Sequence, residues 1–344
     1  MLREPRIDRQ RRQTIEGDAR EGAEVPADET TRGGATPERA SHRSTAELRG
    51  ADPIRSLAFH RLGQNDRATT RTPNRFDKAF RAPSGPARVS IEVSGDTADV
   101  SIEADARDLD ALAHGVPGLL GLEDVGHAQF EPPASADPRR ILRDARARAR
   151  SLRLVKVPWL YELLVLIVIQ QRVAHADAMR SHRWLLTHLG EPYPGEPATR
   201  LFPSPLTLSR ISPEVFRQAD IDRERAERLR AVGRIARHLP RIAAMPLSEA
   251  RATLAKVRGL GPWTIEHFLG SGLGAADAVP TGDYWYPHTV AWALAGEERA
   301  DDRRMLELLE PLRPHRYRAL LWLAAAHAGP VRRGPRMRRA GPPR

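Results

Sequence analysis

The stretch from Leu254 to Asp283 constrains the fold more than any other part of the sequence. Leu254 and Val257 have the spacing of one apolar face of a helix, and Gly259-Leu260-Gly261 then interrupts that pattern. Pro262 suits the first turn of a second helix, because its missing N–H would have no intrahelical partner there. The stretch therefore predicts two helices joined by a glycine hairpin.

The two glycines of this hairpin have a possible binding role. They allow a tight turn and leave backbone N–H groups exposed at a helix N-terminus, where a DNA phosphate can bind. Asp283 follows in a turn-rich segment, so a carboxylate lies a short distance along the chain from an anion site. Taken alone, a Gly-x-Gly pattern is more typical of an ordinary helix–helix turn.

Charge and composition narrow the class of protein. The 344 residues carry a formal net charge of +11, which favours a polyanionic partner such as nucleic acid, although a basic tail would have the same effect on the total. The chain has no cysteine, which excludes disulfides, cysteine-bound zinc or iron–sulfur clusters and thiolate nucleophiles. The longest apolar run, 163–169, is far shorter than the roughly 20 residues that span a bilayer. We expect a soluble, cytoplasmic protein with no membrane partner.

The N-terminal part divides into two predicted regions. Residues 1–52 have too few apolar side chains to offset the entropy of ordering, so we expect a disordered segment. Residues 53–135 are predicted to form a small antiparallel sheet. Apolar residues alternate on either side of a Ser-Gly-Asp-Thr turn at 94–97, and shorter alternations mark further strands; these residues are Leu57, Phe59, Phe76, Phe80, Val89, Ile91, Val93, Val100 and Ile102.

The remainder of the chain has helical patterning. We expect helices in two subdomains over 136–329 and a flexible basic tail over 330–344. The run 163–169 fits either a buried strand or a buried helix, and its helical surroundings favour the helix.

His175, His182 and His188 are spaced by seven and six residues, which is not the spacing of a metal site, so we interpret them as surface residues. The sequence has no phosphate-binding loop, dinucleotide fingerprint, Ser-His-Asp nucleophile elbow or H-E-x-x-H metal site.

Several segments resemble one protein family in the same order along the chain. They are VRGLGPWTIEHFL (257–269), DAVPTGD (277–283), LYELLVLIVIQQRV (160–173), the segment 202–229 and LRPHRYRALLWLA (312–324). Together they resemble the helix-hairpin-helix (HhH-GPD) DNA glycosylases of the DNA-3-methyladenine glycosylase II type. Residues 282–288, 305–311 and 332–337 are similar to an actinobacterial subgroup. The resemblance covers about 53–338 and is loosest over the predicted sheet.

The resemblance implies a fold and an activity. The fold is mainly α, with HhH-GPD helical domains and a small N-terminal antiparallel β (α+β) domain. The activity is a DNA glycosylase of base excision repair, which flips a damaged base from double-stranded DNA and hydrolyses its N-glycosidic bond. Asp283 matches the family's catalytic aspartate, which stabilises an oxocarbenium-like sugar and positions water. Asp283 alone is also consistent with a helix cap. No cofactor is implied beyond a monovalent cation at the hairpin, and we expect a monomer.

Individual site residues also follow from the resemblance. Lyase-competent members carry a Schiff-base lysine where this chain has Trp263, which implies a monofunctional enzyme without AP-lyase activity. The alkylated purine, of 3-methyladenine or 7-methylguanine type, would stack in an aromatic pocket by cation–π attraction. The predicted base-pocket residues are Trp263, Tyr284, Trp285, Trp322 and His267, with Tyr286 a further candidate; the predicted DNA-phosphate-binding residues are Gly259, Leu260, Gly261 and Thr264.

The sequence departs from the family at two pocket positions. His267 replaces an aromatic residue, and the position of another aromatic falls on Ala324, with Trp322 displaced by two. Two other classes therefore remain open. One is a helix-hairpin-helix DNA-binding protein that lost or changed the chemistry, and the other is a basic nucleic-acid-binding protein with no lesion preference.

Overall fold

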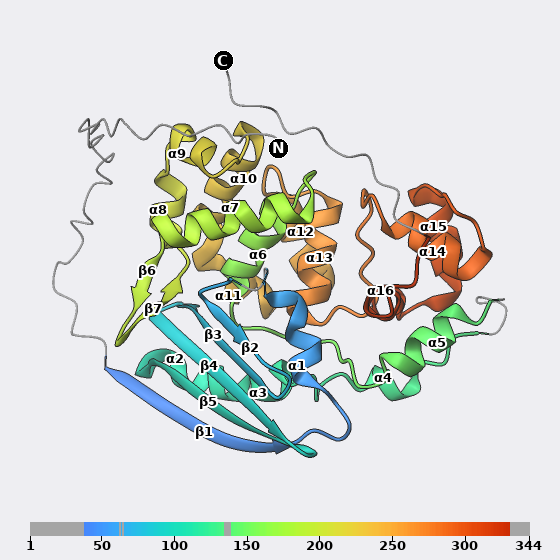
Figure 1. Ribbon diagram of the computed structural model, residues 1–344, viewed down its shortest axis with the longest axis horizontal. Coiled ribbons are helices and arrows are strands. Elements are labelled where there is room, and N and C mark those ends of the chain that lie inside the picture. The colour runs from blue at the N-terminus through green and yellow to red at the C-terminus, as the bar shows by residue number, and fades with distance from the viewer. Residues whose placement is uncertain (1–37, 62, 64, 134–138, 331–344) are drawn as a thin grey trace, which may run out of the picture. The chain divides into compact units, whose positions relative to one another are not determined.

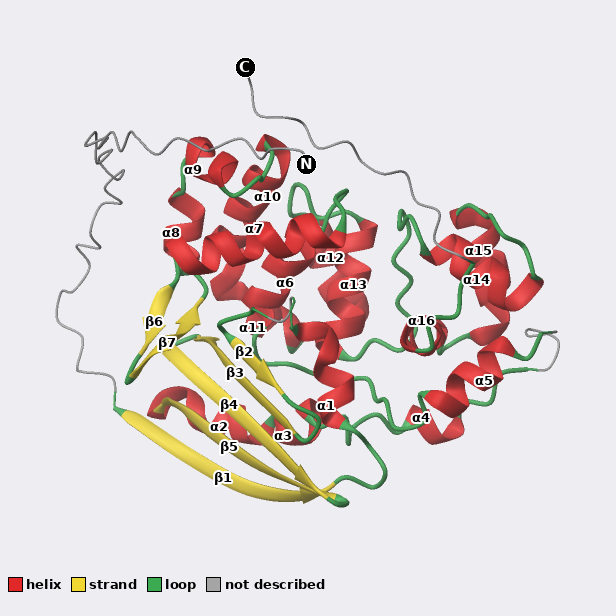
Figure 2. Cartoon of the chain, in the orientation of Figure 1, coloured by secondary structure: helices red, strands yellow, loops and turns green. Residues whose placement is uncertain are grey.

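An antiparallel sheet and a set of helices make up the fold (Figures 1 and 2). The computed structural model describes residues 38–61, 63, 65–133 and 139–330. The predictions for 1–37 and for the basic tail at 331–344 lie outside the described residues. The observed architecture is α+β, with two antiparallel sheets alongside the helices.

The larger sheet has five strands in the order β1-β5-β4-β3-β2. Its strands are β1 (Arg39–Glu47), β2 (Thr69–Arg71), β3 (Arg75–Ala82), β4 (Gly85–Ser94) and β5 (Thr97–Asp105). The predicted hairpin is confirmed, since Val89 pairs with Ile102 and Ile91 with Val100 across the β4–β5 turn. The apolar residues on the buried face pack against the helices, as the period-two pattern requires.

The prediction of disorder through residue 52 is wrong for β1. This strand pairs with β5 along its whole length, from Arg39 opposite Asp105 to Glu47 opposite Thr97. Its side chains are only half-buried or exposed, and its only apolar residues are two alanines. The strand is held by backbone hydrogen bonds to a sheet edge, which leave no hydrophobic pattern in the sequence. Leu57 and Phe59 are likewise not in a strand, because α1 (Pro53–Ser56) and η1 (Leu57–His60) occupy that segment.

The helix α6 (Leu160–Ile169) lies at the centre of the helical part. All ten of its residues are buried, which confirms a helix and explains why the run has no polar face. It packs against α7 (His175–His188), α10 (Arg223–Ile235) and α13 (Pro262–Leu273). The sheet shares this core, because Phe76 and Phe80 belong to the same buried cluster as α6. The predicted boundary at residue 135 therefore does not separate two cores.

A second buried cluster is formed by helices on either side of residue 280. It contains side chains from α5 (Ile141–Arg148), α14 (Tyr286–Ala295), α15 (Asp302–Leu309) and α16 (Arg316–Ala325). The remaining helices are α2 (Ala106–His114), α3 (Val116–Leu119), α4 (Gly126–Gln129), α8 (Pro205–Arg210), α9 (Pro213–Gln218), η3 (Ala236–His238), α11 (Leu239–Ala243), α12 (Leu247–Ala255) and η4 (Glu310–Leu312). The site described next lies between the two clusters.

Two further details differ from the sequence-based predictions. A small hairpin, β6 (Glu191–Tyr193) and β7 (Glu196–Leu201), was not predicted, because its only large buried side chains are Tyr193 and Leu201. His182 is buried and stacked on Phe202, so the prediction of a surface histidine is wrong there. It occupies the face of α7 that turns toward the core.

Candidate active site

Asp283 is held at the start of α14 by both carboxylate oxygens. Gly282 precedes it with φ +84°, a conformation that favours glycine. Oδ1 accepts hydrogen bonds from the backbone N–H of Trp285 (2.7 Å) and of Tyr286 (2.9 Å). Oδ2 accepts one from the indole N–H of Trp263 at 2.8 Å. The carboxylate therefore has a fixed position and also caps the helix N-terminus.

The electrostatic environment favours the ionised form of Asp283. Burial raises the pKa of this carboxyl, but the neighbouring His267 imidazole, the Trp263 indole and the two backbone N–H groups lower it by more. The net pKa is below the ordinary value of 3.8. His267 Nε2 lies 4.0 Å from Oδ2, beyond a direct hydrogen bond. An ionised, largely buried carboxylate is suited to stabilising positive charge or positioning water.

The glycine hairpin joins α12 to α13 as predicted. Gly259 has φ +93°, and a Cβ there would lie 2.5 Å from Cγ of Arg228, so this position requires glycine. Gly261 is extended and exposed, and a Cβ there would meet nothing within 4 Å. Among the described residues, no acceptor is hydrogen-bonded to the N–H groups of Gly261, Trp263 and Thr264. These amides at the N-terminus of α13 are suited to an anion.

The structure corrects the role expected of two hairpin side chains. Leu260 is buried in the core and its N–H donates to the carbonyl of Val257 (3.1 Å), so neither group is left for a phosphate. The hydroxyl of Thr264 is buried and accepts a hydrogen bond from Gln171 Nε2 at 2.7 Å. Arg228 donates in turn to Gln171 Oε1 at 2.9 Å. Thr264 therefore fixes the hairpin to the segment after α6, and only its backbone N–H remains for a ligand.

The cation predicted at the hairpin would need oxygen donors. Across residues 256–264 these are backbone carbonyls and the buried Thr264 hydroxyl, and no carboxylate is present in that segment. The described residues contain no cluster of three His, Cys, Asp or Glu that could hold a metal ion. The monovalent cation stays a prediction.

A cavity of about 420 Å³ opens beside the His267–Asp283 pair, within the usual size range of ligand sites. His267 and Tyr286 line it, and both contact Asp283 or its helix. The rest of its wall comes from α1, η1 and the residue after it, the loop at 153–155, α6 and the residue after it, α7, α13 and α16. These residues are Ser56, Ala58, Phe59, His60, Arg61, Arg153, Leu154, Val155, Leu163, Leu166, Ile167, Gln170, His175, Gly270, Ser271, Tyr317, Leu321 and Ala324.

Of the five predicted base-pocket residues, the structure brings only His267 to the cavity wall. Trp263 lies behind it and holds Asp283. Tyr284 is 57% exposed and packs edge-on against Trp285, and neither lines the cavity. Trp322 is buried in the second core cluster, stacked on Phe130, so its prediction as a pocket residue is wrong.

The geometry of α16 explains why Trp322 was mistaken for a pocket residue. Tyr317, Leu321 and Ala324 follow the i, i+4, i+7 spacing of one helix face and line the cavity, whereas Trp322 points to the opposite face. Tyr317 was therefore detectable from its spacing relative to Ala324. Arg61 and Arg153 come from loops, where no periodicity exists to predict their direction.

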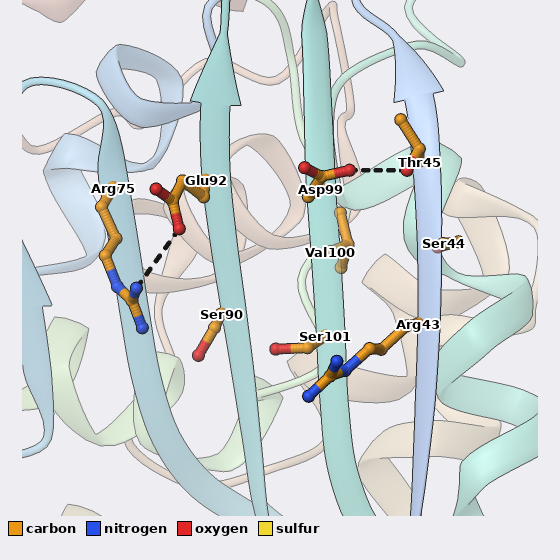
Figure 3. Close-up of a pocket in the computed structure, with 9 residues that line it drawn as sticks. All are labelled: Arg43, Ser44, Thr45, Arg75, Ser90, Glu92, Asp99, Val100 and Ser101. Carbon is orange, nitrogen blue, oxygen red and sulfur yellow. Dashed lines mark hydrogen bonds and ion pairs between the residues drawn. The ribbon is translucent and has the colours of Figure 1, made fainter.

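A larger hollow of about 520 Å³ lies on the exposed face of the sheet (Figure 3). Its side chains come from β1, β3, β4 and β5, and they are paired with one another: Arg75 with Glu92 and Thr45 with Asp99. No predicted site residue lines it. The cavity beside Asp283 differs from this hollow, because a carboxylate fixed by three hydrogen bonds lies next to it.

The fold can be compared with solved structures. The 3-methyladenine DNA-glycosylase from Archaeoglobus fulgidus superposes with a TM-score of 0.68 at 17% identity, over 83% of this chain and 97% of that one. MBOgg1 in complex with a low-affinity DNA ligand gives a TM-score of 0.54 at 18% identity, over 75% and 96%. The 8-oxoguanine glycosylase/lyase of Clostridium acetobutylicum gives 0.52 at 15% identity, over 75% and 98%.

These likenesses establish that the chain has the helix-hairpin-helix DNA glycosylase fold, which the sequence predicted. No family model matches the chain, and a search of curated proteins finds no match. The actinobacterial subgroup stays a prediction. No helix within the described ranges combines the length and apolar character needed to cross a bilayer.

Proposed function

Because the chain has the helix-hairpin-helix DNA glycosylase fold, we propose that it is a monofunctional DNA glycosylase of base excision repair. It would hydrolyse the N-glycosidic bond of an alkylated purine that has been flipped out of double-stranded DNA. The observation that carries this proposal is the ionised Asp283 carboxylate, fixed by hydrogen bonds beside a base-sized cavity.

The carboxylate has the properties that glycosidic hydrolysis requires. As the bond to the base lengthens, the sugar acquires positive charge, which a nearby fixed carboxylate stabilises. The same carboxylate can orient a water molecule and take its proton. The lowered pKa of Asp283 keeps it in the required form at neutral pH.

The hairpin would bind the DNA backbone. The N–H groups of Gly261, Trp263 and Thr264 lie at the N-terminus of a 12-residue helix, where the helix dipole adds to the attraction for a phosphate. Lys256 and Arg258 are exposed beside them. Contacts of this kind bind any duplex and place it without reading its sequence.

The scarcity of lysines supports base release without strand cleavage, because strand cleavage by a lyase needs an amine that can form a Schiff base. The sequence has only Lys78, Lys156 and Lys256, and none lines the cavity. Trp263 occupies the hairpin position and cannot form a Schiff base. We therefore expect an intact abasic strand as the product.

The test compares the wild type with Asp283→Asn on methylated duplex DNA. We expect the wild type to release 3-methyladenine or 7-methylguanine and to leave the strand uncut on a denaturing gel. The asparagine variant keeps an acceptor for the two backbone N–H groups but has no charge, and its release should fall at least about 100-fold. Equal release by both proteins would remove Asp283 from the mechanism.

Measuring the affinity for abasic-analogue and undamaged duplexes alongside base release separates the two other classes. A relative without chemistry would bind an abasic-analogue duplex better than an undamaged one, yet release no base. A general basic protein would bind both duplexes equally, with the same steep salt dependence.

A further inference from the structure

Gln171 lies where three helices meet. It is the second residue after α6, and α6 packs against both α10 and α13 (Figure 1). Its amide Nε2 donates to the hydroxyl of Thr264 at 2.7 Å, and its Oε1 accepts from Arg228 Nη1 at 2.9 Å. Gln171 and Thr264 are both buried. One buried amide therefore joins α10 to the first turn of α13.

The partners fix the orientation of this amide. A guanidinium is a donor only, so Arg228 must face the amide oxygen, and Nε2 then faces Thr264. A threonine hydroxyl can accept as well as donate, so it fits the donor Nε2. Arg228 is itself held by Glu224 of the same helix, with a hydrogen bond of 2.8 Å. The bonds from Thr264 through Gln171 and Arg228 to Glu224 therefore form one connected chain.

This chain of bonds contacts the hairpin on both sides of Gly261. Before it, Arg228 lies so close to Gly259 that a Cβ on that glycine would be 2.5 Å from Cγ of the arginine. After it, Gln171 holds Thr264 in the first turn of α13. The backbone N–H groups proposed to bind phosphate belong to this same turn. Their placement therefore depends on the Gln171 amide.

The first turn of α13 also holds the carboxylate. Trp263 is adjacent to Thr264 and donates to Asp283 Oδ2 at 2.8 Å. One turn of helix is thus fixed to Gln171 by one residue and to Asp283 by the next. The proposed phosphate site and the carboxylate therefore share one rigid support.

The cavity has one wall from α6 and another from α13. Gln170, next to Gln171 in the chain, lines it on the α6 side, and the other lining residues of these two helices are Leu163, Leu166, Ile167, His267, Gly270 and Ser271. The bond between Gln171 and Thr264 joins the two walls. A displacement of about 1 Å can lower a rate by about 100-fold. A bond that sets the distance between the walls can therefore affect base release more than DNA affinity.

We propose that Gln171 is a positioning residue for base release. Its amide sets α13 against α6, so that a duplex bound at the hairpin presents its flipped base to Asp283 in the cavity. This inference rests on the proposed function. Gln171 does not itself line the cavity and acts through Thr264 and Arg228.

Two substitutions of Gln171 separate hydrogen bonding from packing. Methionine has a similar length and fills the same space, but it forms neither bond. Glutamate keeps both bonds, because its carboxylate accepts from Arg228 and the Thr264 hydroxyl can turn to donate to it. Gln218→Met is the matched control, since Gln218 is exposed at the end of α9 and lines no part of the cavity.

The measurement compares single-turnover release of 7-methylguanine, at saturating protein, with affinity for an undamaged duplex. We expect Gln171→Met to lower the rate by about 10- to 100-fold and to weaken affinity by less than about fivefold. Gln171→Glu should stay within about threefold of the wild type in both quantities, because its bonds are kept. Gln218→Met should match the wild type. Urea unfolding checks that each variant is folded at the assay temperature.

Thr264→Val tests the same bond from its other partner, and it serves also if Gln171→Met does not fold. Valine keeps the shape of threonine without the hydroxyl, so the rate should again fall by about 10- to 100-fold. The double variant Gln171→Met/Thr264→Val should lose no more than the larger single loss, because both changes remove one bond. Losses that multiply would mean that the two residues act independently, which would overturn the inference.

The remaining outcomes are equally definite. A wild-type rate in folded Gln171→Met would leave the amide with a role in stability only. Equal losses in the methionine and glutamate variants would show that the side chain acts by its shape, and a loss of affinity alone would confine its effect to the phosphate contact. Each of these results overturns the inference. Failure of the proposed function is recognised separately, because the wild type itself would then release no base from methylated DNA.

Discussion

The indole N–H of Trp263 donates a 2.8 Å hydrogen bond to Oδ2 of Asp283. An indole is a donor only, so this bond favours the ionised carboxylate and never the protonated one. Trp263 of the hairpin helix therefore fixes the position of the Asp283 carboxylate. The hairpin and the segment that carries Asp283 are thereby connected through one hydrogen bond, so DNA bound at the hairpin would lie near this carboxylate.

Replacing Trp263 by Phe tests this connection. The substitution keeps an aromatic ring in the helix but removes the donor to Asp283. A hydrogen bond to a charged group contributes about 1.5–3 kcal/mol, so we expect the rate of base release to fall by about 10- to 100-fold, with little change in duplex affinity. Trp184→Phe is the matched control, since Trp184 stacks on His188 away from the cavity. Equal losses in rate and affinity would indicate a displaced hairpin instead.

The lowered pKa of Asp283 predicts how stability changes with pH. Because the pKa is lower in the folded chain than the ordinary 3.8, the ionised carboxylate stabilises the fold at pH values above 3.8. That contribution is lost as the pH falls through the folded pKa. Asp283→Ala should therefore lower the free energy of unfolding by about 1–2 kcal/mol at pH 7, and by progressively less below pH 4. Urea unfolding of both proteins across this range measures the difference. A gap that widened in acid would contradict the lowered pKa.

The sequence predicted the elements that have strong local patterns. The β4–β5 hairpin, the buried helix α6 and the glycine hairpin each have a spacing that one kind of structure explains. The edge strand β1 has no such spacing, because its stability comes from pairing with a distant strand. The β6–β7 hairpin escaped prediction for the same reason, since Tyr193 becomes buried only when it meets Ala79 of β3.

The same distinction, between local sequence patterns and distant contacts, applies to the residues of the candidate site. Asp283 and His267 were identified by their positions relative to the hairpin, and the structure places them together. Trp322 was chosen for its residue type, but a helix face decides which side chains reach a cavity, and that face carries Tyr317 instead. The Arg61 and Arg153 guanidinium groups could not be anticipated, because loop geometry alone brings them to the wall.

The two hairpin glycines should respond differently to alanine. At Gly259 the positive φ and the close approach of Arg228 make alanine unfavourable, and we expect a loss of about 1–3 kcal/mol in the free energy of unfolding. At Gly261 the backbone is ordinary and the space is open, so stability should change by less than about 0.5 kcal/mol. The added methyl group would nevertheless lie where a phosphate approaches.

Fluorescence anisotropy with labelled duplexes completes this comparison. Gly261→Ala should bind damaged and undamaged DNA about fivefold to tenfold more weakly, by a similar factor for both, because phosphate contacts carry no base preference. Unchanged affinity in this folded variant would remove the hairpin from the DNA interface. Loss of affinity for the damaged duplex alone would place Gly261 in the base pocket instead.

We expect the buried ion pair between Arg318 and Asp124 to contribute strongly to the free energy of unfolding. It lies next to elements that form the cavity wall. Both side chains are almost wholly buried, and two hydrogen bonds of 2.5 Å join them, while Asp124 also accepts from the N–H of Leu154. Arg318 belongs to α16, which carries Tyr317 and Ala324 of the cavity wall. Removing one partner leaves an unpaired buried charge. Arg318→Met should therefore lower the free energy of unfolding by about 3–5 kcal/mol.

Urea unfolding of the wild type, Arg318→Met, Asp124→Leu, the double variant and a control tests this expectation. The double variant Arg318→Met/Asp124→Leu removes both charges and should recover part of the loss of Arg318→Met, because no charge is then left unpaired. Arg303→Met is the control, since Arg303 is 83% exposed in its pair with Glu307 and such pairs contribute little. If the double variant were less stable than the sum of the single losses predicts, Asp124 would instead act mainly through the N–H of Leu154. The loop that carries Arg153 to the cavity would then depend on that one hydrogen bond.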